Sequence, residues 1–370
     1  MFSAEIIDTW EKFGALEPEW NHLLTESDLD IPLMTFEWFS CWWQSYGAKN
    51  TLAVIVVRQG NEAVAIVPLM RTAFAWRGIP VRALTFMANY HSLRTGCVAA
   101  REVRGLGSFI FDTLRARMDP FDLLLFDYVP KPSRTAALLE EALGDRRFFH
   151  VVYPGARSPY IKVEGTWQSY LQTRQKSLRE KVNYMSNVLK RHGTVDIVTY
   201  RTCQGQDIER ALENMLAISR GTWKYCQNTA IASSLEDTRF YTLLARKAAE
   251  KGWLNLWIMS LEGKPAAFVY NLEYKNRVFG LKTGFDDRYR KSAPGKYLDH
   301  WTIRESFERG HVEFDMLGKD DPFKMSWTSL FRQHYRYVVF SSTLRGQAAA
   351  VMEKTVMPLV RKVMRSNTDA

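Results

Sequence analysis

Residues 277–327 combine a strand pattern, a helix start and several charged side chains. An apolar run leads into a basic turn, and the sequence Ser-Ala-Pro-Gly at 292–295 then opens a predicted helix. Proline is favoured in the first turn of a helix, so Ser292 or Ala293 is the expected N-cap of a helix that begins at Pro294. The free N–H groups of a first helical turn bind anions without any particular side chain. This segment therefore predicts a phosphate-binding site.

The residues around this turn suit a phosphate ligand. Gly295 lets a ligand approach the backbone closely. Three cations, Arg288, Arg290 and Lys291, precede the helix and add positive charge. A pyrophosphate fits such a cradle. An ordinary strand-to-helix turn with a solvated basic rim has the same residue pattern, so spacing alone leaves both interpretations open.

The predicted elements that position this turn follow an α/β order. Helices and a strand precede a hairpin at 254–274, and a strand follows at 277–285. A helix at 294–309 crosses the sheet, and a strand at 312–317 returns to it. The first half of the chain repeats a fainter version of this order. A mixed α/β fold is therefore predicted.

Length and composition predict two globular lobes. The chain has 370 residues, enough for two domains with separate cores, and 46% of them are hydrophobic. The segment 151–160 contains two prolines and a glycine and is the expected linker. We therefore expect an N-terminal lobe at 1–155, a second lobe at 156–340 and an amphipathic C-terminal helix or tail at 341–370.

Short motifs along the chain carry a family resemblance. In the last quarter they are Tyr289, Ser292, Pro294, Gly295, Leu298, Phe314, Asp315, Gly318, Asp320, Lys324 and Trp327. Earlier motifs lie at 36–38, 42–43, 64–69, 252–254, 263–267 and 278–283. Together they resemble the CelD-like branch of the GNAT (GCN5-related N-acetyltransferase) superfamily, which is related to the FemABX peptidyltransferases. The resemblance covers about residues 30–330 and is strongest at its C-terminal end.

The resemblance implies tandem GNAT-like domains with the acyl-CoA N-acyltransferase fold. In a GNAT domain the strand before the Pro-Gly turn splays from the next strand, and the pantetheine arm of CoA enters the gap. Carried over, Lys282, Thr283 and Gly284 border the acyl thioester, and backbone amides polarise its carbonyl. The implied CoA-binding residues are Lys282, Thr283, Gly284, Arg288, Arg290, Lys291, Ser292, Pro294 and Gly295.

The implied reaction is direct attack by an amine on the thioester. It requires a neutral amine, a group that takes its proton and an acid near the leaving sulfur. Asp315, on the returning strand, and Asp320 or Asp321, just after it, are the candidate bases. A structural alternative for Asp315 is a carboxylate satisfied by the backbone or by Arg304.

Other residues near this strand are also candidates. Lys324 and Trp327 resemble the family's lysine and tryptophan signature, and Tyr289 is a candidate proton donor. In the structural alternative Lys324 pairs with Asp320, whereas Trp327 and Tyr289 pack in the core. The family more often has tyrosine at the position of Phe323, so a hydroxyl role there is lost.

The resemblance also points to substrate-binding residues. The family places a polar loop of the first lobe towards the cleft between the lobes. Tyr90 and His91 lie in the matching region and, with Trp327, are the predicted substrate-site residues. The four cysteines are scattered and the histidines form no ligand pattern, so no metal is predicted.

The charge pattern bears on partners and location. The net charge is +10, which favours anionic partners such as lipid, tRNA or the phosphates of CoA. An amphipathic helix is predicted from near Thr166 to Gly193, with its basic residues between Arg174 and Arg191. Another at 345–365 suits a membrane interface or packing on its own domain. No signal peptide or run of 18 apolar residues is found. We expect a cytoplasmic enzyme, peripheral at the inner face of the membrane.

These observations predict an acyl-CoA-dependent N-acyltransferase, with acyl-CoA as co-substrate. Its expected acceptor is an amine on a sugar, a lipid or a sphingoid-type base, in exopolysaccharide or lipid biosynthesis. One alternative is a FemABX-like transferase that uses aminoacyl-tRNA, with the basic helix as the tRNA surface. Another is a non-catalytic module that binds polysaccharide or lipid. Acyl length, acceptor identity and oligomeric state do not follow from the sequence.

Overall fold

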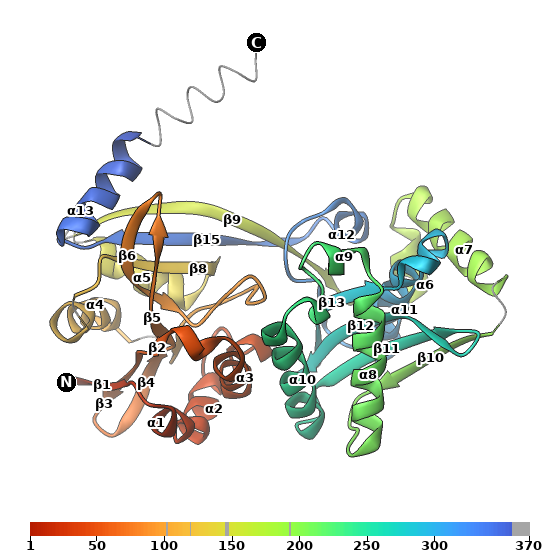
Figure 1. Cartoon of the computed structure of the whole chain (residues 1–370), viewed down its shortest axis with the longest axis horizontal. Coiled ribbons are helices and arrows are strands. Elements are labelled where there is room, and N and C mark those ends of the chain that lie inside the picture. The colour runs from red at the N-terminus through yellow and green to blue at the C-terminus, as the bar shows by residue number, and fades with distance from the viewer. Residues whose placement is uncertain (101–102, 119, 145–147, 192–193, 357–370) are drawn as a thin grey trace, which may run out of the picture. The chain divides into compact units, whose positions relative to one another are not determined.

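The computed structural model describes residues 1–100, 103–118, 120–144, 148–191 and 194–356 (Figure 1). The chain divides into two compact units. Unit 2 is Arg157–Arg332, and unit 1 is Met1–Ala156 together with the chain from Gln333 onward. The expected second lobe included residues 333–340, whereas the structure assigns these residues to unit 1.

Unit 1 contains two sheets and the helices that cover them. The first sheet has the order β1-β3-β4-β7, from β1 (Phe2–Ile7), β3 (Val54–Gln59), β4 (Glu62–Val67) and β7 (Val98–Ala99). The second runs β15-β8-β6-β5-β2, from β15 (Phe331–Phe340), β8 (Leu123–Lys131), β6 (Ile79–Phe86), β5 (Leu69–Trp76) and β2 (Thr51–Leu52). The helices are α1 (Trp10–Gly14), α2 (Glu17–Thr25), α3 (Phe36–Tyr46), α4 (Leu106–Arg117), α5 (Arg134–Gly144) and α13 (Leu344–Val351).

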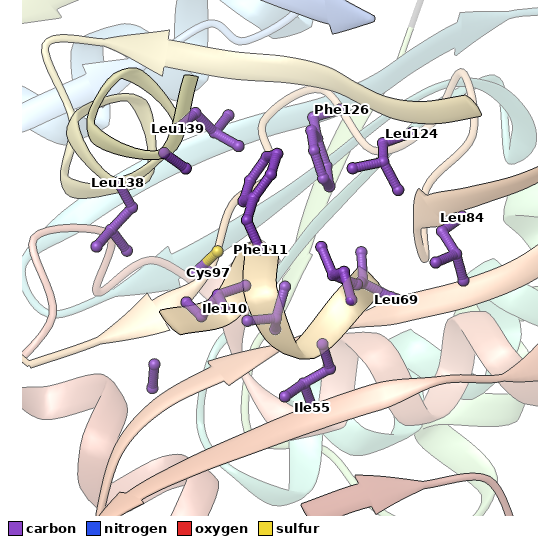
Figure 2. Close-up of a cluster of buried hydrophobic side chains, with 14 of the residues drawn as sticks. Ile55, Leu69, Leu84, Cys97, Ile110, Phe111, Leu124, Phe126, Leu138 and Leu139 are labelled. Atoms are coloured by element: carbon purple, nitrogen blue, oxygen red, sulfur yellow. The ribbon is translucent and has the colours of Figure 1, made fainter. Parts of the chain in front are cut away.

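The core of unit 1 forms where α4 and α5 pack on the strands. Figure 2 shows Phe111 of α4 and Leu139 of α5 beside Phe126 of β8. Each of these side chains is buried, and burying one such side chain contributes about 1.5–3 kcal/mol to stability. Four aromatic side chains of α3 are also buried: Phe36, Trp38, Phe39 and Trp42. The Thr35 hydroxyl caps this helix by accepting a hydrogen bond from the N–H of Trp38 (3.3 Å).

Asp122, just before β8, links three segments of unit 1. Its fully buried carboxylate accepts hydrogen bonds from Arg82 Nη2 (3.1 Å) and from the Thr343 hydroxyl (2.8 Å). Thr343 is the N-cap of α13, so this carboxylate ties the C-terminal segment to β6 and β8. Burial favours the protonated acid, but the bonds from Arg82 and Thr343 outweigh it and lower the pKa of Asp122 to about 2.

We expect Asp122→Asn to lower the free energy of unfolding by about 3 kcal/mol at neutral pH, because it weakens charged hydrogen bonds. A carboxylate whose folded pKa is depressed stabilises the fold above its unfolded pKa and loses that effect as pH falls. The difference between the two proteins should therefore shrink from about pH 4 to about pH 2. Urea unfolding across this range tests it, with exposed Asp8→Asn as the control. A constant difference would contradict the assignment.

Unit 2 is built on one mixed sheet of order β10-β11-β12-β13-β14-β9. Its strands are β10 (Val195–Tyr200), β11 (Leu254–Leu261), β12 (Lys264–Tyr274), β13 (Arg277–Phe285), β14 (Glu313–Asp315) and the end of β9 (Phe149–Lys162). Neighbouring strands are antiparallel except for the parallel pair β13 and β14. The helices are α6 (Trp167–Gln172), α7 (Lys176–Lys190), α8 (Gln206–Arg220), α9 (Trp223–Cys226), α10 (Leu235–Glu250), α11 (Pro294–Glu308) and α12 (Pro322–Trp327).

The predicted order of hairpin, strand, crossing helix and returning strand is present in unit 2. The hairpin is β11 and β12, the strand is β13, the helix is α11 and the returning strand is β14. The mixed α/β fold class is therefore confirmed. The predicted C-terminal helix is described only as far as α13 and the short π-helix at Met352–Val356, and its remaining residues lie outside the described chain. No described helix has the length and apolar character needed to span a membrane.

Candidate active site

Strand β14 of unit 2 pairs with only the first part of β13. β13 pairs with β14 only from Arg277 to Phe279, and then continues alone on that side to Phe285. The register between β12 and β13 shifts at the same place, because Asn271 lies opposite Gly280 whereas Tyr270 lies opposite Lys282. This bulge and the short partner strand leave one edge of β13 open.

A cavity of about 1010 Å³ lies at the open edge of β13. Its wall comes from β12, β13 and α11, from the end of β14, and from α9 and α12. The charged side chains that line it are Lys224, Lys282, Arg290, Lys296, Asp299, Asp321 and Lys324. The cavity lies entirely within unit 2.

Helix α11 begins beside this cavity, as the Ser-Ala-Pro-Gly turn predicts. Pro294 is its first residue, and Ala293 is the N-cap in a left-handed conformation with φ of 48°. No side chain caps the helix, so its first N–H groups are not occupied by a capping side chain. A Cβ on Gly295 would lie 3.1 Å from Phe285 Cδ1, so any side chain there would crowd the cavity wall.

Asp299, which the sequence reasoning missed, lies one turn after Gly295 on α11 and lines the cavity. Its Oδ1 accepts a hydrogen bond from the Thr283 hydroxyl (2.7 Å). Burial raises the pKa of the Asp299 carboxyl to about 6, although Thr283, Lys324 and Lys224 favour the ionised form. The one available signal was the spacing of four residues from Gly295, which places both residues on the same face of the helix.

Two lysines, Lys224 and Lys324, act on this carboxylate, and a third, Lys282, lines the same cavity. Lys224 Nζ donates to the carbonyl of Thr283 (3.0 Å), and Lys324 Nζ donates to the carbonyl of Leu317 (2.7 Å). Lys282 Nζ lies 5.8 Å from the centre of the Tyr241 ring. Burial lowers the pKa of all three ammonium groups, and that of Lys282 falls to about 8 with help from the charge of Lys224. Asp299 and Lys282 thus both titrate near neutrality.

The structure brings some of the predicted CoA-binding residues together and leaves others elsewhere. Those that line the cavity are Lys282, Thr283, Arg290 and Gly295. Gly284 instead faces Phe268, whose ring would lie 2.3 Å from an added Cβ. Arg288 pairs with Asp286 (2.7 Å). Ser292 and Pro294 are buried and Lys291 is exposed, and none of the three lines the cavity.

The predicted catalytic residues are also divided. Lys324 lines the cavity, whereas Asp315 is 0% exposed, accepts from the N–H of Leu317 (3.0 Å) and pairs with Arg332 (3.2 Å). The cation beside Asp315 is thus Arg332. Asp320 accepts from Arg157 Nε (2.8 Å). Tyr289 packs against the core cluster that contains Leu189 and Trp257.

The three predicted substrate residues lie outside the cavity. Trp327 is 0% exposed and packs in the core of unit 2. Tyr90 and His91 belong to unit 1, where Tyr90 is 54% exposed and lines a separate cavity of about 300 Å³. His91 is buried, and its ring stacks on that of Tyr46 with 6.1 Å between centroids. Within the described chain, no group of three or more His, Cys, Asp or Glu side chains could hold a metal ion.

Most of unit 2 matches a known family of acetyltransferase domains. Residues 176–325 match the family model described as an acetyltransferase (GNAT) domain. The matched region runs from α7 to α12 and includes every residue of the cavity wall. This match confirms two predictions, that the protein is an N-acyltransferase and that it has a GNAT fold. The assignment to the CelD-like branch stays a prediction.

Solved structures share the fold across both units. FemX is 10% identical, with 90% of this chain and 96% of that chain covered and a TM-score of 0.56. The C-terminal domain (DUF2156) of a putative lysylphosphatidylglycerol synthetase from Agrobacterium fabrum is 10% identical, with 92% and 97% covered and a TM-score of 0.55. A tandem GNAT protein from the clavulanic acid biosynthesis pathway is 12% identical, with 93% and 100% covered and a TM-score of 0.52. No curated protein matches the chain.

Proposed function

We propose that this enzyme transfers an acyl group from a CoA thioester to an amine by direct attack. The observation that supports this most is the cavity of unit 2, which joins the open edge of β13 to the N-terminus of α11. Arg290 and the first N–H groups of α11 would hold the phosphates of CoA. The pantetheine arm would lie along β13, whose edge beyond Phe279 has no partner in β14.

Two cavity residues have pKa values that suit the proton transfers. Asp299, with a pKa of about 6, is mostly ionised at neutral pH and would take the proton of the attacking amine. Lys282, with a pKa of about 8, would return a proton to the sulfur as the C–S bond breaks and the C–N bond forms. Lys324, predicted as catalytic, would keep the Asp299 carboxyl ionised before the transfer, because its positive charge lowers the pKa of that group. Asp315 and Asp320 are not carried into this proposal, because neither lines the cavity.

The acceptor in this proposal is an amine on a sugar, a lipid or a sphingoid-type base. Unit 2 would bind the acyl-CoA, and unit 1 would act as the second GNAT-like lobe. A cytoplasmic enzyme that associates peripherally with an anionic membrane agrees with the net charge of +10. Acceptors presented at a membrane would place the enzyme in exopolysaccharide or lipid biosynthesis.

We expect Gly295→Glu to weaken the binding of acetyl-CoA by at least about tenfold. The new side chain places bulk and negative charge where the phosphates would meet the N-terminus of α11. Isothermal titration of acetyl-CoA into both proteins measures the difference. Gly14→Glu is the matched control, because Gly14 is exposed and an added Cβ there meets nothing within 4 Å. Equal binding by all three proteins would contradict the proposed CoA site.

A second candidate function is aminoacyl-tRNA-dependent transfer, and the outer face of α7 favours it. Lys176 and Lys181 are exposed there beside Tyr184, which is 65% exposed, while Leu178 and Val182 face the core. Lysine and an aromatic ring on one surface suit a nucleic acid. Copurified nucleic acid, and tRNA binding that falls steeply with salt, would favour this function over the first.

A further inference from the structure

A buried amide in the wall of the cavity lacks a hydrogen-bond acceptor. Asn271, on β12, is 1% exposed and lines the cavity. Among the described residues, none accepts a hydrogen bond from its Nδ2. Buried polar groups are almost always paired, and an unpaired one costs free energy comparable to a lost hydrogen bond. An amide left in this state beside a cavity indicates a ligand that supplies the acceptor.

The charge of the cavity wall indicates the same kind of ligand. The cations that line it are Lys224, Lys282, Arg290, Lys296 and Lys324, and the carboxylates are Asp299 and Asp321. Arg290 is paired with Asp287 (3.0 Å), so the four lysines face two carboxylates and positive charge is in excess. Partly buried ammonium groups without enough counter-charge are unfavourable, as their lowered pKa values reflect. A bound anion would relieve this imbalance, whereas a neutral ligand would not.

The position of Asn271 separates this anion from the phosphates of CoA. Asn271 pairs with Gly280, at the point where β13 leaves β14. Phe285, which lies beside Gly295 at the start of α11, is five residues further along β13. At about 3.3 Å per residue the two ends of the cavity are roughly 16 Å apart along the strand. The phosphate end and the Asn271 end are thus different places in one cavity.

We propose that the amine acceptor also carries an anionic oxygen group, a carboxylate or phosphate, which Asn271 Nδ2 and the ammonium groups of Lys282 and Lys324 hold at the Gly280 end of the cavity. This inference rests on the proposed function, because it places the acceptor opposite the CoA phosphates. This changes the acceptor class of the proposed function: a sphingoid base or a neutral amino sugar is excluded, and a small zwitterionic amine, such as an α-amino acid or an amino-sugar phosphate, takes its place. The amide would donate to the anionic oxygen, and the lysines would balance its charge.

Matched pairs of amines that differ by one anionic group test the proposal. The pairs are L-serine with ethanolamine, L-lysine with cadaverine, and glucosamine 6-phosphate with glucosamine. Isothermal titration without CoA should show at least one anionic member binding about tenfold or more tightly than its partner, the effect of about one charged hydrogen bond. Equal or absent binding of both members in every pair would overturn the proposal.

Asn271→Asp supplies the negative charge from the protein itself and removes the amide donor. We expect this variant to keep its melting temperature and to lose about tenfold or more in affinity for the anionic amine. Asn276→Asp is the matched control, because Asn276 is exposed in the turn between the same two strands and carries the same charge change. A loss of affinity as large in the control would overturn the assignment of Asn271.

The binding of desulfo-CoA separates the two possible sources of the anion. If Asn271 serves the acceptor, Asn271→Asp leaves the affinity for desulfo-CoA within about twofold of the wild type. If that affinity falls about tenfold while the anionic amines bind as before, the group at Asn271 is a phosphate of CoA and the proposal is overturned. If the proposed acyl transfer is wrong but the anion site is right, the protein will still bind the anionic amine more tightly than its partner, and no CoA thiol will be released.

Discussion

Asp299→Asn is expected to lower kcat/KM for acyl transfer by about 10²–10⁴, the usual contribution of a positioned general base. The amide keeps the shape of the carboxylate, so the loss comes from the proton acceptor rather than from packing. The assay follows release of CoA thiol in the presence of the amine. Asp196→Asn, an exposed aspartate on β10, is the matched control and should retain full activity.

The pH profile gives a second test of the same residue. In the wild type kcat/KM should rise with pH through about 6, because the Asp299 carboxyl must lose its proton before it can accept one from the amine. In Asp299→Asn this rise should be absent. A wild-type profile that is flat between about pH 5 and pH 7 would assign the base to another group.

As pH rises through about 6, the stability contributed by Asp299 should fall while the activity rises. The folded pKa of Asp299, about 6, lies above its ordinary value of 3.8, so between these values the folded state binds more protons than the unfolded state. The stability contributed by this protonation is complete below about pH 4 and is lost as pH rises through about 6. Removing the charge at neutral pH should therefore leave the melting temperature unchanged or raise it. A lowered melting temperature together with lost activity would indicate a structural role.

Asp299 also shows why part of the site did not follow from the sequence. The turn at Pro294 obeys a local rule, because proline and the free N–H groups of a helix start act within a few residues of each other. The environment of Asp299 depends on Lys224 and Lys324, which arrive from α9 and α12. No spacing along the chain brings these groups together. The burial that raises the pKa of this carboxyl likewise comes from tertiary packing.

Asp315 shows the complementary difficulty. The strand that carries it was predicted from an apolar pattern, and β14 is present at the expected place. The strand lies between β13 and β9, and Arg332 reaches its carboxylate from the start of β15. The pattern predicts a strand but not its neighbours, so it does not tell whether a side chain faces a ligand or a buried arginine. The same ambiguity explains why residues 333–340 were expected in the second lobe. Their sequence is compatible with a strand, but it does not indicate that this strand pairs with β8 of unit 1.

Trp327→Ala is expected to lower the free energy of unfolding by about 3–5 kcal/mol, as for other large buried aromatic side chains. The indole is fully buried, and its ring lies 6.1 Å from that of Trp167 and 6.1 Å from that of His300. Alanine would leave a cavity that these rings could not fill. Urea unfolding of the two proteins measures the difference.

Trp327→Phe separates packing from the substrate contact that the family resemblance implies. Among the described residues, none accepts a hydrogen bond from the indole Nε1, so phenylalanine removes volume but no side-chain hydrogen bond. We expect a loss of roughly 1 kcal/mol in stability and little change in kcat/KM. If Trp327→Phe instead kept full stability and lost about tenfold in kcat/KM, the ring would contact substrate. A substitution that preserves an aromatic ring lowers stability where the ring fills the core, and lowers kcat/KM where the ring contacts substrate.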